Sequence, residues 1–169
     1  MKKTTRRHML YLTYTGVIAA LYVVLTLASA LFGLSGMGAI QLRLSEALCV
    51  LPYFTAAAVP GVTVGCLLAN FFTGAALPDI VFGTLATLIG AVGTRCLRRY
   101  PYLAPLPPIV ANTVIIPFVI RYAYIDVDAS LPFLFLSVGI GEIASVGVLG
   151  TALLLALKPH RQRIFRNEK

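Results

Sequence analysis

Charged residues are scarce in this sequence. They make up 12% of the 169 residues, whereas 59% are hydrophobic and the mean hydropathy is +0.88. In a water-soluble protein, charged types usually account for about a quarter of the residues. This chain has too few of them to cover a soluble fold, so we expect an integral membrane protein.

Motifs of nucleotide and hydrolytic chemistry are also missing. The sequence contains no G-x-x-x-x-G-K-[ST] loop, and neither H-E-x-x-H nor G-x-S-x-G occurs in it. These absences argue against ATP hydrolysis within this chain and against the usual intramembrane hydrolases. The two histidines, His8 and His160, lie in basic terminal segments, where solvated surface residues are expected. We therefore expect a membrane subunit that is not an enzyme and that carries no cofactor.

Cysteine is limited to Cys49, Cys66 and Cys96, an odd number without C-x-x-C spacing. All three lie in or beside apolar runs, so we interpret them as free residues that contribute to packing. Neither a disulfide framework nor a metal site is expected.

Positive charge is abundant and unevenly placed. The net charge is +8, and all of the 14 Lys and Arg residues except Arg43 and Arg121 fall within residues 2–7, 95–99 and 158–169. Cytoplasmic loops of membrane proteins retain Lys and Arg. We therefore attribute the charge to membrane topology rather than to nucleic-acid binding, and expect all three clusters on the cytoplasmic side.

Between these clusters, the apolar runs predict six helices in a single transmembrane domain covering residues 1–169. A helix needs about 20 apolar residues to cross the hydrocarbon layer. The spans are expected at about residues 10–33, 46–59, 61–76, 79–97, 106–122 and 132–157. Four crossings then separate the first two basic clusters and two separate the last two, which places both termini in the cytoplasm. The expected fold class is an all-α six-helix membrane bundle.

Proline and glycine mark two of the predicted connections. Val59-Pro60-Gly61 is expected to turn the chain after the second span, and residues 74–78 after the third. The second and third spans are short, which is typical of segments interrupted near a binding site.

Ala28-Ser29-Ala30 resembles the cleavage site of a secretory signal peptide. However, the apolar run before it is longer than the core of a signal peptide, and its removal would leave five spans, so we expect the segment to be retained as the first span.

A small set of polar residues is expected at membrane depth or at its outer edge. They are Arg43, Ser45, Glu46, Asn70, Asp79, Asn112, Arg121 and Glu142. Such groups are costly in lipid and usually face the interior of a bundle or an aqueous cavity. Because most of them fall toward the outer ends of the predicted spans, we expect them to converge on an outward-facing pocket.

Several of these residues have a structural alternative at a helix start. Arg43 and Glu46 are three residues apart and would pair there, where Ser45 or a carboxylate would also cap exposed amides. Asp79 follows Pro78 and fits an N-cap equally well.

Other residues of the set lie deeper. Asn70 and Asn112 would join helices by hydrogen bonds even without a ligand. Glu142 lies about ten residues into the last span, where a carboxylate needs a partner in the protein or in a ligand. We favour a functional role for Glu142, with Arg121 as its structural partner when no ligand is bound.

Three segments resemble the QueT family of queuosine-precursor transporters. They are residues 41–48 with Leu51-Pro52, residues 65–70 and residues 79–87. That family comprises substrate-binding S components of energy-coupling factor (ECF) importers. The resemblance implies a six-helix subunit of the cell membrane that captures a 7-deazaguanine base outside. It further implies docking on a membrane scaffold (T) subunit and two cytoplasmic ATPases, which would hydrolyse the ATP.

The same resemblance implies a docking role for small residues in the first span. S components carry small residues at four-residue spacing that pack against the scaffold subunit, and Gly16 and Ala20 provide one such step. Val24 departs from the pattern at the next step. Ordinary packing inside the bundle is the alternative for this stripe.

The implied substrate can be compared with the available side chains. A guanine-like edge presents an N–H and an adjacent amino group, which match the two oxygens of a carboxylate. The candidate carboxylates are Glu142, Glu46 and Asp79. Asn70 and Asn112 offer both a donor and an acceptor, and Phe82 or Tyr122 would stack on the flat face of the ring. A second carboxylate would suit a precursor that bears an ammonium group.

Three other functions remain open at this point. The chain would serve as an S component for another small vitamin-like ligand, as a proton-coupled permease with Glu142 as its proton site, or as a purely structural membrane subunit. A permease usually shows two halves related by an internal repeat, and none is evident in the sequence.

Overall fold

The computed structural model describes residues 3–34, 42–124 and 129–164 of the chain. Over these ranges the chain is almost wholly helical and no residue belongs to a β-strand. The predicted all-α class is therefore confirmed for the described part of the protein.

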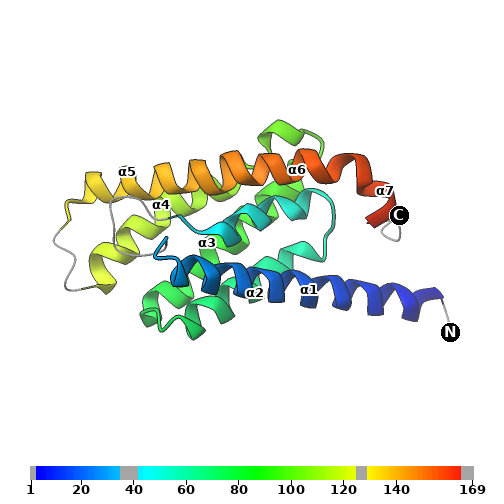
Figure 1. Ribbon diagram of the computed structural model, residues 1–169, viewed down its shortest axis with the longest axis horizontal. Helices are drawn as coiled ribbons and strands as arrows, with labels where there is room; N and C mark the ends of the chain where they lie inside the picture. The colour runs from blue at the N-terminus through cyan, green and yellow to red at the C-terminus, as the bar shows by residue number, and fades with distance from the viewer. Residues whose placement is uncertain (1–2, 35–41, 125–128, 165–169) are drawn as a thin grey trace.

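In the described residues, six main helical segments follow one another. Figure 1 shows how they are arranged. They are α1 (Lys3–Leu31), the 3₁₀ helix η1 (Leu44–Tyr53), α2 (Ala58–Phe72), α3 (Leu77–Cys96), α4 (Leu106–Ala123) and a final rod. The rod consists of α5 (Leu131–Glu142), the π-helical segment η3 (Ile143–Gly150) and α6 (Thr151–Leu157). Short helical turns complete the described chain: η2 (Pro101–Leu103), η4 (Lys158–His160) and α7 (Arg161–Ile164).

The described helices differ in length in the way that the sequence predicted. Four are long and apolar enough to cross a membrane, at Thr5–Leu31, Leu77–Cys96, Pro101–Ala123 and Leu131–His160. The second and third segments, η1 and α2, are apolar but shorter, with 10 and 15 residues. A 3₁₀ helix rises about 2.0 Å per residue, so η1 is longer than an α-helix of the same residue number.

The predicted turn at Val59-Pro60-Gly61 is wrong. The chain turns earlier, between the end of η1 and Ala58, and Pro60 lies in the first turn of α2. Proline fits there because the first N–H groups of a helix have no acceptor within it, so nothing is lost when one is missing. The first helix also begins earlier than predicted, since α1 extends back through the basic segment to Lys3.

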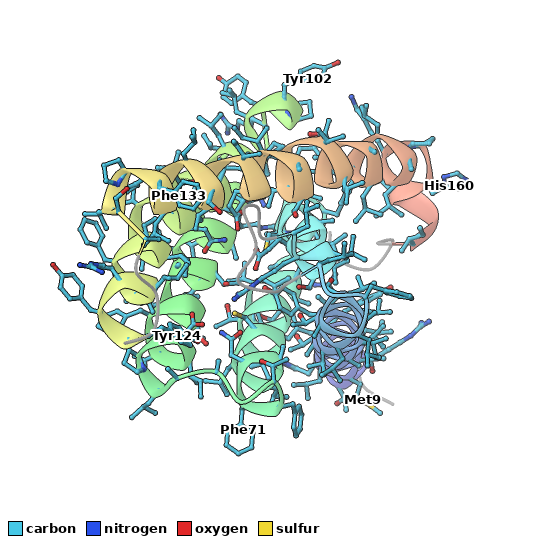
Figure 2. The ribbon with its side chains drawn as sticks, turned by 60° about the vertical axis from the view of Figure 1, so that its left-hand side comes forward. Met9, Phe71, Tyr102, Tyr124, Phe133 and His160 are labelled. Carbon is cyan, nitrogen blue, oxygen red and sulfur yellow. The ribbon has the colours of Figure 1, made fainter. Side chains whose placement is uncertain are left out.

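The described residues of the three basic clusters lie at one end of the bundle. The start of α1 and the end of α7 are both at this end (Figure 1). Arg95 Nη1 donates a hydrogen bond to the Pro52 carbonyl oxygen at 3.2 Å, and Arg161 lies over the Tyr53 ring at 5.7 Å from its centroid. Figure 2 shows Tyr124 well away from His160. The charge pattern requires an even number of crossings between each pair of clusters, and an even number brings them to the same end, as seen here.

The centre of the bundle is the 3₁₀ helix η1. It packs against α1, α2, α3, η3 and α6. Its residues from Leu48 to Tyr53 are all buried, with Cys49 and Val50 completely so. Because η1 is enclosed on its sides, polar groups on it face other protein groups rather than lipid.

The cysteines are all free, as predicted. Cys49 and Cys66 are buried in the main core, whereas Cys96 is exposed at the end of α3. The packing role expected for Cys96 is therefore wrong, because the helix ends beyond the core at this residue.

Two helix pairs approach closely at glycines. A Cβ added to Gly65 of α2 would lie 2.7 Å from Tyr22 Cβ of α1, and one added to Gly90 of α3 would lie 2.6 Å from Pro108 Cα of α4. Real Cβ atoms do not approach so closely, so a larger residue at either position would force the helices apart.

We expect Gly90→Ala to lower the free energy of unfolding by about 1–3 kcal/mol, because the new methyl group meets the backbone of Pro108. Gly16→Ala is the matched control, since a Cβ at Gly16 has no neighbour within 4 Å. Thermal unfolding in detergent measures both. A Gly90→Ala variant as stable as Gly16→Ala would contradict the close packing of α3 on α4.

Candidate ligand-binding site

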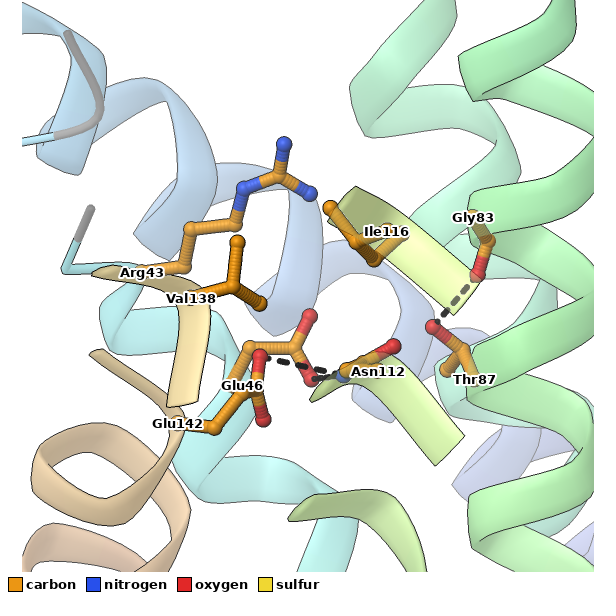
Figure 3. Close-up of a pocket in the computed structure, with 8 residues that line it drawn as sticks. All are labelled: Arg43, Glu46, Gly83, Thr87, Asn112, Ile116, Val138 and Glu142. Carbon is orange, nitrogen blue, oxygen red and sulfur yellow. Dashed lines mark hydrogen bonds between the residues drawn. The ribbon is translucent and has the colours of Figure 1, made fainter. Parts of the chain in front are cut away.

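Two buried carboxylates meet one amide at the centre of the bundle. Asn112 Nδ2 on α4 donates hydrogen bonds to Glu46 Oε2 of η1 at 3.3 Å and to Glu142 Oε1 of α5 at 3.1 Å (Figure 3). None of the three residues is more than 8% exposed. The sequence prediction that these residues converge is therefore correct.

Glu46 is fully held by protein groups. Tyr22 of α1 donates its hydroxyl proton to Glu46 Oε1 at 2.5 Å, and the Cys49 thiol donates to Oε2 at 3.2 Å. Cys49 reaches Glu46 because a 3₁₀ helix has three residues per turn, which aligns residues three apart on one face. With Asn112 as a third donor, both oxygens of Glu46 are occupied.

Glu142 is held on one side only. Its Oε1 accepts from Asn112, but its Oε2 is buried and has no hydrogen-bond partner within the described parts of the chain. A buried acceptor without a partner costs about 1–3 kcal/mol, more for a charged group. Glu142 Oε2 is therefore the position in this cluster where a ligand donor would be favourable.

Arg121 is not the partner of Glu142. Its side chain is exposed in the last turn of α4, and the carboxylate of Glu142 is bound by Asn112 instead. The prediction placed both residues in one pocket because they are polar, but Arg121 is at the end of its helix and Glu142 is in the interior.

A small cavity separates the polar side chains of the cluster. It has a volume of about 20 Å³. Its lining residues are Arg43, Glu46, Gly83, Thr87, Asn112, Ile116, Val138 and Glu142. This volume holds about one water molecule, whereas pockets for small organic ligands have about 300 Å³ or more.

A second, larger cavity of about 330 Å³ lies at the end of the bundle away from the termini. It is lined by Thr26, Ala30, Gly33, Arg43, Asn70, Thr73, Gly74, Ala75, Asp79 and Tyr124. Arg43 lines both cavities. We call the smaller one the inner cavity and the larger one the outer cavity.

Arg43 and Ser45 do not act as the helix-start alternatives proposed. In the residues that the structure describes, the Arg43 guanidinium forms neither a hydrogen bond nor an ion pair with Glu46. Thr26 donates its hydroxyl proton to Ser45 Oγ at 2.8 Å, and no side chain caps η1. The segment starts without a cap because these side chains point to α1 and to the cavities.

Asp79 lies inside the first turn of α3, whose N-cap is Ala76, so the N-cap alternative for Asp79 is wrong. Its Oδ2 accepts a hydrogen bond from the Tyr124 hydroxyl at 2.9 Å, and its Oδ1 is buried with no partner among the described groups. Tyr124 is not among the residues predicted for the site. The available signal was its position two residues beyond Tyr122, which puts it on another face of the helix end.

Asn70 is buried beside Asp79. Its Nδ2 is 3.6 Å from Cys66 Sγ, one turn earlier in α2. A Cβ added to Gly83 would lie 3.2 Å from Asn70 Nδ2 and 3.3 Å from Asp79 Oδ1. Because Gly83 has no side chain, Asn70 Nδ2 and Asp79 Oδ1 approach its backbone closely. Gly83 itself lines the inner cavity, so both polar groups lie near that cavity.

Phe82 and Tyr122 are not part of either polar cavity. They line an apolar groove of about 360 Å³ between α3 and α4 and are 47% and 81% exposed. On α3, Asp79, Gly83 and Thr87 face inward at four-residue spacing, which turns Phe82 outward. In this structure these two aromatics therefore lie apart from the two polar cavities, and their stacking on a ligand stays a prediction.

No group of three or more His, Cys, Asp or Glu side chains is arranged to hold a metal ion within the described residues. The polar groups of the site in the described residues are two carboxylates with unpartnered oxygens, one half-buried guanidinium and two buried amides.

A comparison with known protein families decides the family. The model of the QueT transporter family matches residues 12–159, which is most of the chain. The chain belongs to the QueT transporter family. The resemblance seen in the sequence is thereby confirmed, and the apolar helices agree with a multi-pass membrane protein.

One curated relative of this QueT family member is the queuosine precursor transporter QueT of Lactococcus lactis subsp. cremoris (strain MG1363). The two are 38% identical over 73 residues, which is 43% of this chain and 42% of the relative. The chain thus matches less than half the length of that relative. No solved structure matches the chain.

The small residues of α1 in this QueT family member point away from the bundle. Gly16 and Ala20 are exposed, and a Cβ at Gly16 would meet nothing within 4 Å. Ala19, on another face of the helix, is the buried residue that packs near Gly65. Packing within the bundle therefore does not explain the Gly16–Ala20 step.

We expect Tyr22→Phe to destabilise the protein by about 1.5–3 kcal/mol, because it leaves Glu46 Oε1 buried without its donor. Tyr11→Phe on the same helix is the control and should change stability by less than about 0.5 kcal/mol, since Tyr11 is exposed. Thermal unfolding of the two variants measures the difference. Equal stabilities would mean that the Tyr22 hydroxyl does not hold Glu46.

Proposed function

We propose that this protein is the substrate-binding S component of an ECF importer and that it captures a queuosine precursor, a 7-deazaguanine base. The observation that carries the proposal is the buried, unpartnered Oε2 of Glu142 beside the inner cavity. The guanine edge supplies the N–H and amino donors that a carboxylate accepts together. Membership of the QueT transporter family and the name of the relative support this choice of ligand.

The groups around the inner cavity have different roles in this proposal. Glu142 accepts the donor edge of the base, and Asn112 keeps the carboxylate oriented. Glu46 is saturated by Tyr22, Cys49 and Asn112, so it fixes Asn112 rather than binding the ligand directly. Since the cavity of about 20 Å³ is smaller than a bicyclic base, the walls formed by α4 and α5 must separate when the ligand enters.

The membrane orientation follows from the shared end of the basic clusters. Lys and Arg are retained in the cytoplasm, so we place the termini and the loop at residues 95–99 on the cytoplasmic side of the cell membrane. The outer cavity, at the opposite end, then opens to the outside, where substrate is captured.

Energy for transport comes from partners in this proposal. The sequence holds no nucleotide-binding loop, so ATP is hydrolysed by two cytoplasmic ATPase subunits coupled through a membrane scaffold subunit. We assign the exposed Gly16–Ala20 face of α1 to that scaffold, because small residues let another helix approach closely.

Reconstitution in liposomes tests the proposal against the proton-coupled permease, which would also use the buried carboxylate of Glu142. Uptake of a 7-deazaguanine base only in the presence of scaffold, ATPases and ATP supports an S component. Accumulation by the isolated protein under a proton gradient without ATP contradicts it.

Glu142→Gln should weaken binding of a queuosine-precursor base by about tenfold to a few hundredfold, because the new amide places a donor against the donor edge of the ligand. Calorimetric titration measures the affinity, and a melting curve shows whether the variant is folded. Tyr122→Ala is the control, and its affinity should be unchanged because Tyr122 lies in the apolar groove. Unchanged affinity in folded Glu142→Gln would remove Glu142 from the ligand site.

Ala20→Leu should reduce assembly with the scaffold and ATPases while leaving ligand affinity unchanged, since the added side chain fills the contact face of α1. The matched control is Ala152→Leu on α6, which makes the same change at another exposed position. Co-purification of the partner subunits measures assembly. Equal recovery with both variants would place the scaffold on another surface.

A further inference from the structure

The basic end of the bundle carries more positive charge than its own carboxylates balance. Twelve of the 14 Lys and Arg residues fall within residues 2–7, 95–99 and 158–169. Of the six acidic residues, only Glu168 belongs to these segments. Side-chain carboxylates within the segments therefore neutralise at most one of these charges, and the excess favours an anionic partner outside the chain.

The start of α1 reaches the level of the lipid headgroups. With 29 residues, α1 is about 43 Å long, whereas the hydrocarbon layer of a bilayer is about 30 Å thick. Counting about 20 residues back from Leu31 puts the boundary of that layer near Tyr11, which is exposed. Tyrosine is enriched at such boundaries. Arg6 and Arg7 precede Tyr11 and therefore lie among the headgroups.

The last described residues turn back toward α1 at the same end (Figure 1). The Tyr14 hydroxyl of α1 donates a hydrogen bond to the carbonyl oxygen of Ile164 in α7 at 2.6 Å. Arg7 is two helical turns before Tyr14 and so lies on the same side of α1. The Tyr14 contact therefore holds α7 beside the side of α1 that carries Arg7.

Basic residues at the end of the rod complete this surface. Lys158 begins η4, and Arg161 begins α7 with its guanidinium over the Tyr53 ring. Both side chains are exposed, as are those of Arg6 and Arg7. A guanidinium that is stacked on an aromatic ring by its face keeps its N–H donors in the plane of the fork, where they bind phosphate oxygens.

We propose that the start of α1 and the η4–α7 turn form a binding site for the headgroup of an anionic phospholipid. The site consists of Arg6, Arg7, Lys158 and Arg161, and we call it the headgroup site. Arginine matches phosphate oxygens through two parallel hydrogen bonds, and lysine adds a compact positive charge. In the orientation proposed above, the lipid belongs to the cytoplasmic leaflet, where anionic lipids attract basic segments next to a span.

The neighbourhood of the headgroup site favours a lipid over a soluble phosphate. Met9 and Leu12 are 54% and 67% exposed on α1, directly on the hydrocarbon side of the two arginines. An apolar surface next to a basic one fits a molecule with an acyl chain and a phosphate group. A lipid bound there would connect α1 to α7 in addition to the hydrogen bond between Tyr14 and Ile164.

Native mass spectrometry of the delipidated full chain in a neutral detergent tests the proposal. The probes are phosphatidylglycerol, which is anionic, phosphatidylcholine with the same acyl chains, which has no net charge, and glycerol phosphate, which lacks acyl chains. Phosphatidylglycerol should bind about tenfold to a hundredfold more tightly than phosphatidylcholine. Glycerol phosphate should bind at least about tenfold more weakly than phosphatidylglycerol, because it lacks the apolar contacts.

Arg6→Gln and Lys158→Gln should each weaken the binding of phosphatidylglycerol by about fivefold and leave that of phosphatidylcholine within about twofold. Arg121→Gln is the matched control, since it removes the same charge from an exposed position at the opposite end of the bundle. Its affinity for phosphatidylglycerol should stay within about twofold of the wild type. A melting curve of each variant shows that it is folded.

Four results would overturn the headgroup site. Equal binding of the two lipids by the wild type would do so without any variant. An equal loss in Arg121→Gln would assign the preference to the net charge of the protein. Glycerol phosphate bound as tightly as phosphatidylglycerol would indicate a site for a soluble anion. Unchanged lipid binding in Arg6→Gln and Lys158→Gln, together with reduced recovery of partner subunits, would assign the surface to an acidic protein.

Discussion

The amide of Asn112 is the interaction on which the centre of the bundle depends. Two carboxylates are buried a short distance apart in an apolar protein, where they would repel each other without donors between them. One amide nitrogen carries two protons and satisfies one oxygen on each side. Because Glu46, Asn112 and Glu142 come from η1, α4 and α5, this single group fixes three segments relative to one another.

The packing around this amide explains why Glu46 and Glu142 differ. The 3₁₀ helix η1 is enclosed by its neighbours, and its Glu46 receives donors from Tyr22 and Cys49 as well as Asn112. Glu142 lies where α5 changes to the π-helical η3, an irregularity that is frequent at functional sites. One carboxylate is therefore part of the framework, and the other keeps an oxygen for a ligand.

Much of the architecture was predictable from the sequence. Long apolar runs mark α1, α3, α4 and the α5–α6 rod, and the placement of Lys and Arg predicts that their clusters share one end. The convergence of Glu46, Asn112 and Glu142 was predictable as well, because polar groups in an apolar bundle have few other places to go.

The missed features depend on side-chain direction and local geometry. Phe82 and Tyr122 differ from inward-facing residues only in their angular position on a helix. In lipid, the outer side of a helix is as apolar as its buried side, so the sequence has no polar stripe that tells the two sides apart. The same applies to Tyr22 and Tyr124, whose hydroxyls reach carboxylates from distant segments. The 3₁₀ form of η1 was also not evident, because a short apolar run with one proline fits several conformations.

The most direct test is a structure of this protein with a 7-deazaguanine base bound. Our interpretation predicts that the ring N–H and amino group are hydrogen-bonded to the Glu142 carboxylate, with Oε2 now occupied and Asn112 still between the two glutamates. A base seated in the groove of Phe82 and Tyr122, or bound elsewhere with Glu142 Oε2 still unpartnered, would contradict it.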